Sequence, residues 1–302
     1  MIELAGLTKV FGRTVAVDDL TCSVEPGMVT GFLGPNGAGK TTTMRLILGL
    51  DHPTAGTATI DGRAYRELKD PLHTVGALLD ARAFHPGRSA RTHLQALAAT
   101  NGIGRHRVEE VLDLVGLRDV AHRRAGGFSL GMGQRLGIGA ALLGDPEVVL
   151  LDEPVNGLDP DGVVWIRDLL RRLAGEGRTV FVSSHLMSEM ALTADHLVLL
   201  GRGRLLADVS LAELTARADG RVLVRSPQPA ELTRLLAAPG VTVTRAGPEQ
   251  LAVVGRTSAE IALAALAAGV LLTELTPVHA SLEDAYLAMT HADVEFPGRV
   301  AA

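Results

Sequence analysis

Gly34-Pro35-Asn36-Gly37-Ala38-Gly39-Lys40-Thr41-Thr42 is the stretch that decides the fold of this chain. An apolar run at residues 28–33 precedes it, and a helical pattern at residues 43–50 follows it. The glycines let successive backbone N–H groups turn towards one anion, and a helix that starts at the loop adds the positive end of its dipole. A strand, a glycine-rich loop and a helix in this order predict a phosphate-binding loop.

Lys40 and Thr41 are the side chains of this loop that carry chemistry. In the pattern G-x-x-x-x-G-K-[ST], the lysine reaches the β- and γ-phosphates and the hydroxyl ligates Mg²⁺. A glycine-rich turn without a ligand can match the same pattern by chance. The strand before the loop and the helix after it make that alternative the weaker one.

Composition sets the broad class. The chain has 302 residues and 47% hydrophobic content, which is enough for a real core and longer than one typical domain, so we expect two domains. A net charge of −5 gives no general electrostatic reason to bind nucleic acid. Cys22 is the single cysteine and cannot form an intrachain disulfide, so a buried, inert thiol in a reducing cytoplasm is expected.

Membrane and targeting signals are weak in this sequence. Residues 1–10 lack a basic stretch followed by an apolar block, so no signal peptide is expected. The longest apolar run, residues 261–272, falls short of the roughly 20 residues that a membrane-spanning helix needs. We therefore expect that the chain is not itself a channel.

The first two thirds of the chain alternate between strand and helix patterns. An antiparallel pair is expected at residues 2–7 and 15–24, with Phe11 at the turn, and a helical insertion at about 88–143. Further strands are expected at 57–60, 75–79, 148–151, 179–183 and 196–200, and helices at 162–174 and 186–194. Short buried strands alternating with helices predict a mostly parallel sheet covered on both faces, with a nucleotide at its carboxyl end.

The order of the expected strands and helices changes beyond residue 216. The expected order is strand 221–225, helix 230–237, strands 241–245 and 250–254, helix 258–268, strand 270–275 and helix 282–289. The βαββαβ part of this order is the ferredoxin-like arrangement. We therefore expect domains at residues 1–215 and 216–302.

Asp152 and Glu153 end the apolar strand at 148–151. One carboxylate at such a strand end can hold Mg²⁺, and a second can take a proton from attacking water. An acidic pair at a turn or helix start before Pro154 is the commoner meaning of Asp-Glu. The phosphate loop upstream shifts the balance towards chemistry.

Ser129-Leu130-Gly131-Met132-Gly133-Gln134-Arg135 opens a helix that is rich in glycine. Each glycine in a helix interior costs roughly 1 kcal/mol against alanine, so the cluster needs a reason. Close approach of the backbone to another surface supplies one.

These segments, with Gly157-Leu158-Asp159 and Ser184-His185, resemble in order the motifs of ABC-type ATPase subunits. The segment Leu282-Glu283-Asp284-Ala285-Tyr286-Leu287 looks like the daunorubicin/doxorubicin-resistance branch, whose members drive ABC-2 type exporters. The resemblance implies an α/β fold: a P-loop NTPase domain of the ABC type with a helical subdomain at about 88–143. A small ferredoxin-like α+β domain would follow it.

The resemblance also implies roles for single residues. Glu153 would be the general base, His185 would contact the γ-phosphate, and Phe11, where the family more often has tyrosine, would stack on adenine. The loop residues expected to hold the nucleotide are Gly34, Asn36, Gly37, Ala38, Gly39, Lys40, Thr41 and Thr42. Mg²⁺ would be held by Thr41 and Asp152.

Three more roles concern a second copy of the chain and a membrane partner. Ser129 and Gly131 would close over ATP bound to the second protomer, and Asp159 would communicate between the two sites. Asp80 stands where the family usually has glutamine, and its carboxylate cannot donate an amide hydrogen bond. The hypothesis is that Asp80 still links the metal to the surface that receives the membrane partner.

The resemblance finally implies a setting. It predicts an ATP- and Mg²⁺-dependent homodimer on the cytoplasmic face of the membrane, with an integral membrane permease on a separate chain and no nucleic acid. A soluble ABC ATPase acting on ribosomes or DNA is the alternative, but the two linked nucleotide domains or long coiled-coil insertion usual there are not in this sequence. The last domain could stabilise the dimer or sense a ligand.

Overall fold

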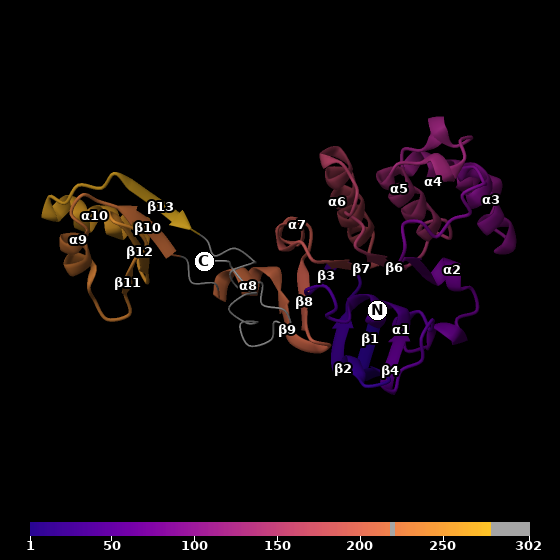
Figure 1. The fold of residues 1–302 in the computed structure, drawn as a ribbon, viewed down its shortest axis with the longest axis horizontal. Helices are drawn as coiled ribbons and strands as arrows, with labels where there is room; N and C mark the ends of the chain where they lie inside the picture. The colour runs from indigo at the N-terminus through magenta and orange to yellow at the C-terminus, as the bar shows by residue number, and fades with distance from the viewer. Residues whose placement is uncertain (218–220, 279–302) are drawn as a thin grey trace. The chain divides into compact units, whose positions relative to one another are not determined.

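The computed structural model describes residues 1–217 and 221–278 of the chain (Figure 1). Two compact units divide between Leu211 and Ala212, and each is described by itself. The expected helix at 282–289 and the segment Leu282–Leu287 lie outside the described residues. Among the helices of residues 1–217 and 221–278, none combines the length and apolar character needed to cross a bilayer.

The first unit contains two sheets. One is antiparallel, with the order β2-β1-β4, and is built from β1 (Ile2–Phe11), β2 (Thr14–Val24) and β4 (Ala55–Ile60). The other has the order β5-β6-β7-β3-β8-β9. Its strands are β3 (Val29–Leu33), β5 (Val75–Leu78), β6 (Val148–Asp152), β7 (Thr179–Ser184), β8 (His196–Gly201) and β9 (Arg204–Ser210).

The larger sheet is parallel except at its β9 edge, where β9 runs antiparallel to β8. Strands β3 and β7 are buried on both faces, as expected for inner strands of a parallel sheet that is covered on both sides. Phe32 and Phe181 pack ring against ring at 4.8 Å within this core. The expectation of a mostly parallel sheet is confirmed, whereas β9 was not expected.

Helices position the site residues. Helix α1 (Lys40–Ile47) contacts strands of both sheets, namely β2, β4 and β6. A separate group of helices, α3 (Ala90–Thr100), α4 (Arg105–Leu114) and α5 (Leu130–Ala141), packs together, as Figure 1 shows. The first unit also contains α2 (Pro71–Thr74), α6 (Pro160–Gly175) and α7 (Met187–Ala191). Helix α8 (Leu211–Arg217) begins at the last residue before the boundary, and its other residues belong to the second unit.

The second unit has a four-stranded antiparallel sheet with the order β11-β12-β10-β13. Its elements are β10 (Arg221–Arg225), α9 (Pro229–Leu236), β11 (Thr242–Arg245), β12 (Gln250–Val254), α10 (Ser258–Ala268) and β13 (Glu274–Val278). This is the βαββαβ order expected from the sequence. Leu232 and Leu236 of α9 and Ile261 of α10 are buried in the hydrophobic core of this unit, which also includes residues of its strands.

The predicted start of the last strand is wrong. Strand β13 begins at Glu274, not at Val270. Gly269 ends α10 in the left-handed conformation, and the N–H of Val270 donates to the Ala265 carbonyl at 2.9 Å. The apolar side chain of Val270 therefore belongs to the end of the helix, where it is buried.

Candidate functional site

The phosphate loop follows the carboxyl end of β3 and leads directly into α1, three residues earlier than the expected helix start. Gly39 adopts a φ of 103°, and a Cβ there would lie 2.4 Å from the Ala16 carbonyl oxygen, so only glycine fits. Helix α1 has neither a side-chain cap nor an acidic residue in its first turn. Its first N–H groups are therefore available to an anion.

The loop encloses a pocket of about 220 Å³. The pocket is lined by Ala16, Asn36, Gly37, Ala38, Gly39, Lys40, Thr41, Thr42 and Glu153. Gly34 lies at the base of the loop, where its carbonyl oxygen accepts from Nζ of Lys40 at 2.7 Å. The backbone cradle and its cation fit the phosphates of a nucleotide.

Lys40 is the buried cation of this pocket, with only 6% of its side chain exposed. Its Nζ lies 3.6 Å from Oε1 of Glu153 and also donates to the Pro35 carbonyl at 3.2 Å. Burial lowers the pKa of Lys40 from its ordinary value of 10.5, and the nearby carboxylates of Glu153 and Asp152 oppose that shift.

Thr41 and Asp152 come from different elements and meet at the pocket. The Thr41 hydroxyl donates to Oδ2 of Asp152 at 2.6 Å. A hydroxyl and a carboxylate are oxygen ligands of the kind that Mg²⁺ takes, with phosphate and water oxygens completing its shell. The two side chains fit the metal role expected of them.

Glu153 and His185 also meet here, although they follow different strands. Nδ1 of His185 lies 2.7 Å from Oε2 of Glu153. Strands β6 and β7 run parallel, and both residues follow the carboxyl ends of their strands. One carboxylate thus lies between the ammonium of Lys40 and the imidazole of His185.

The backbone of Glu153 is unusual. Its φ of 50° lies in the left-handed region, which costs a residue with a Cβ roughly 1 kcal/mol. Its N–H donates to Oγ of Ser183 at 2.9 Å, and its carbonyl accepts from Nε2 of Gln134 at 3.3 Å. Sequence reasoning missed both contacts, and the only available signal was a polar residue at the end of the buried strand β7.

Ser129 and Gly131 lie at the start of α5, and Asp159 lies where the loop after β6 leads into α6. Ser129 caps α5 by accepting the N–H of Met132 at 3.2 Å, and Asp159 caps α6 by accepting that of Gly162 at 2.9 Å. A Cβ on Gly131 would lie 2.9 Å from the Gly157 carbonyl oxygen, so this glycine allows a close approach of the two segments. None of the three lines the loop pocket.

Phe11 and Asp80 also lie apart from the loop pocket. Phe11 ends β1 with 48% of its surface exposed, and Nζ of Lys9 lies 4.8 Å from its ring centre. Asp80 is exposed after β5, where its Oδ1 accepts the N–H of Arg82 at 2.8 Å. Stacking of Phe11 on adenine therefore stays a proposal, and so does the link that Asp80 would make between the metal and the membrane partner.

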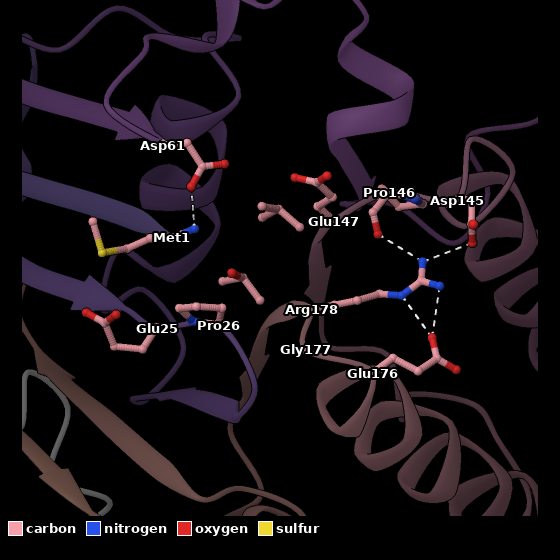
Figure 2. A pocket seen from close by; sticks show the side chains of 12 residues that line it. Met1, Glu25, Pro26, Asp61, Asp145, Pro146, Glu147, Glu176, Gly177 and Arg178 are labelled. Carbon is pink, nitrogen blue, oxygen red and sulfur yellow. Dashed lines mark hydrogen bonds and ion pairs between the residues drawn. The ribbon is translucent and has the colours of Figure 1, made fainter.

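A larger pocket, of about 630 Å³, lies at the amino ends of β6 and β7, away from the loop (Figure 2). Arg178 on its wall is paired with Asp145 at 3.0 Å and Glu176 at 2.9 Å. The amino group of Met1 is paired with Asp61 at 2.7 Å. This pocket faces the carboxyl end of α6, where Glu176 is the C-cap, whereas the loop pocket contains the amino end of α1. A helix amino end attracts an anion and a carboxyl end repels it, so the smaller pocket suits a nucleotide better.

Family models match both parts of the chain. Residues 17–156 match the model described as ABC transporter, and residues 220–283 match a domain of unknown function (DUF8746). The bacitracin transport ATP-binding protein BcrA of Bacillus licheniformis is 42% identical over 220 residues, 72% of either chain. The uncharacterized ABC transporter ATP-binding protein YdbJ of Bacillus subtilis is 32% identical over 298 residues, 98% of this chain and 97% of that one.

A solved structure carries the same fold. The ATP-binding cassette MJ0796, in a dimeric post-hydrolysis state bound to ADP and Pi, superposes with a TM-score of 0.64 at 26% identity. The match covers 70% of this chain and 99% of the cassette.

Proposed function

Because this chain belongs to the ABC transporter family of ATP-binding subunits, we propose that it energises an ABC-2 type exporter whose substrate path lies in a separate membrane permease. The chain is an ATPase, as the members of its family are. The bacitracin transport relative supports an antibiotic or another amphipathic molecule as the cargo. The chain would then work at the cytoplasmic face of the membrane.

One observation carries the chemical part of the proposal. The Glu153 carboxylate lies 3.6 Å from Nζ of Lys40 and 2.7 Å from Nδ1 of His185, beside the Thr41 and Asp152 pair. Lys40 and the first turn of α1 bind the phosphates, and Glu153 takes the proton of the attacking water.

Thr41 and Asp152 hold Mg²⁺, which when bound neutralises phosphate charge. His185 contacts the γ-phosphate and holds the Glu153 carboxylate on its other side.

Hydrolysis requires two copies of the chain in this proposal. Ser129 is the N-cap of α5 and Gly131 lies in its first turn, so these residues present a helix N-terminus to the phosphate bound by the partner. The dimeric MJ0796 cassette supports this arrangement. Binding of ATP closes the dimer and hydrolysis opens it, and the helical group α3 to α5 passes the movement to the permease.

Glu153→Gln tests the proposal. The variant should bind ATP as the wild type does, lose hydrolysis, and accumulate an ATP-bound dimer in size-exclusion chromatography with light scattering. Glu176→Gln, in the pocket at the other end of β7, is the matched control and should keep its turnover. Wild-type turnover in Glu153→Gln would remove this residue from the base role. The proposal of a separate permease is tested by co-purification, which should recover an integral membrane protein together with this chain.

A further inference from the structure

Ser183 connects the two acidic residues of the site through a single hydroxyl. It lies in β7, directly beside Asp152 of β6 in the parallel register, and is fully buried. Its Oγ donates to Oδ1 of Asp152 and accepts the N–H of Glu153 at 2.9 Å. The hydroxyl therefore uses its proton on one acidic residue and a lone pair on the next.

Each of these bonds restrains a different group. Oδ1 of Asp152 is engaged by Ser183, which leaves Oδ2 to face the Thr41 hydroxyl at 2.6 Å. The bond to the Glu153 N–H helps to hold that residue at a φ of 50°, and Gln134 holds the carbonyl of the same residue. A left-handed residue other than glycine persists where its surroundings fix it, and here both backbone groups are fixed.

We propose that Ser183 is a positioning residue for ATP hydrolysis. It orients the Asp152 carboxylate towards the metal side of the loop and fixes the backbone from which the Glu153 carboxylate reaches Lys40 and His185. The inference rests on the proposed roles of Asp152 and Glu153. It assigns to Ser183 no contact with ATP.

The chain supplies a matched control in the adjacent residue. Ser184 is also buried, at 1% exposure, and also belongs to β7. Its hydroxyl accepts the N–H of Leu186 at 2.9 Å, and within the described residues it makes no hydrogen bond to Asp152 or Glu153. Loss of a buried serine hydroxyl as such can therefore be separated from loss of the link between Asp152 and Glu153.

The experiment compares Ser183→Ala, Ser183→Cys, Ser183→Thr and Ser184→Ala in the full chain. Steady-state ATPase activity is titrated with Mg²⁺, ATP binding is measured by equilibrium titration, and thermal unfolding verifies the fold. Ser183→Ala and Ser183→Cys should lower kcat by at least about tenfold, since small misplacements of reacting groups cost up to about 10²-fold. ATP affinity at saturating Mg²⁺ should stay within about twofold, and half-maximal activity should require more Mg²⁺.

Ser183→Thr keeps the hydroxyl and should restore most of the turnover, and Ser184→Ala should behave as the wild type. Ser183→Cys preserves the size of the side chain, so the test survives if the alanine variant folds poorly. Turnover of the folded Ser183→Cys near that of the wild type, or an equal loss in Ser184→Ala, would overturn the proposal.

Glu153→Gln separates this inference from the proposed function. If Glu153→Gln loses hydrolysis while Ser183→Ala keeps it, the positioning role alone is wrong. If Ser183 acts through its neighbours, adding Ser183→Ala to Glu153→Gln should not lower the residual turnover at saturating Mg²⁺ any further, while it should still raise the Mg²⁺ concentration that ATP binding requires. A further loss equal to that of the single variant would place the effect elsewhere and contradict the proposal.

Discussion

Nδ1 of His185 lies 2.7 Å from Oε2 of Glu153, although the two residues are 32 positions apart. Parallel pairing of β6 with β7 brings them together, because both follow the carboxyl ends of their strands. The imidazole therefore limits where the carboxylate of the proposed base can lie. Lys40 limits it from the side of Oε1.

His185→Ala should lower the rate of ATP hydrolysis by about 10²-fold, because the carboxylate of Glu153 loses a positioning contact. ATP binding should be retained, since Lys40 and the loop remain. Steady-state kinetics and the Kd of a fluorescent ATP analogue measure the two effects separately. His196→Ala is the control, because His196 pairs with Asp208 between β8 and β9. Equal activities of the two variants would contradict the role of His185.

Ser129→Asp should separate the two roles of Ser129. Asp is as good an N-cap as Ser, so stability should stay near that of the wild type, whereas Ser129→Ala should lose about 1 kcal/mol. The added charge should repel the phosphate offered by a partner and prevent the ATP-dependent dimer. Light scattering of Ser129→Asp in a Glu153→Gln background measures this.

Ser89 provides the comparison for Ser129. It caps α3 by accepting the N–H of Thr92 at 3.2 Å, so Ser89→Asp makes the same change at another helix start. Ser89→Asp should still dimerise with ATP. If both aspartate variants dimerise like the parent protein, α5 does not bind the partner's phosphate.

The phosphate loop was predictable from sequence because its signal is local. The glycines, Lys40 and Thr41 are contiguous, and apolar patterns mark the strand before and the helix after. The link from Ser183 to Asp152 was not predictable, because it depends on the register between β6 and β7. The strand start predicted at Val270 was wrong because an apolar residue that follows the end of a helix cannot be told by sequence from one that begins a strand.

Asp80→Ala should weaken stimulation of the ATPase by the membrane partner while leaving basal turnover close to the wild type. The Asp80 carboxylate holds the N–H of Arg82 at 2.8 Å, in the segment between β5 and the helical group. Asp80→Asn keeps that hydrogen bond without the charge, so the pair of variants separates loop shape from charge. The measurement is ATPase activity with and without the co-purified partner. Full stimulation of Asp80→Ala would show that Asp80 does not serve the coupling.

The buried ammonium of Lys40 should make stability depend on pH in the alkaline range. Burial lowers the pKa of Lys40 below 10.5, so the folded chain releases this proton before the unfolded chain does. Between the two pKa values the unfolded state binds more protons, and the free energy of unfolding rises with pH. This contribution is complete above about pH 10.5 and is lost as pH falls through the lowered pKa of the folded state.

Lys40→Met should remove that dependence. Urea unfolding at about pH 8 and about pH 10, without added nucleotide, should show the wild type gaining stability relative to Lys40→Met as pH rises. Lys69→Met removes an exposed lysine and serves as the control. If the free energy of unfolding changed with pH by the same amount in the wild type, Lys40→Met and Lys69→Met, Lys40 would not titrate differently in the folded chain.

The start of α10 offers a test of whether the second unit has a stability of its own. Thr257 accepts the N–H of Glu260 at 3.3 Å, and Glu260 accepts that of Thr257 at 2.8 Å, which forms a capping box. Thr257→Ala should cost the second unit about 1 kcal/mol, whereas Thr257→Ser keeps the cap. Because the buried cluster of this unit contains none of the phosphate-loop residues, the loss should appear in one of two calorimetric transitions and leave basal ATPase activity unchanged. A single transition that moves as a whole in Thr257→Ala would instead mean that the two units unfold together.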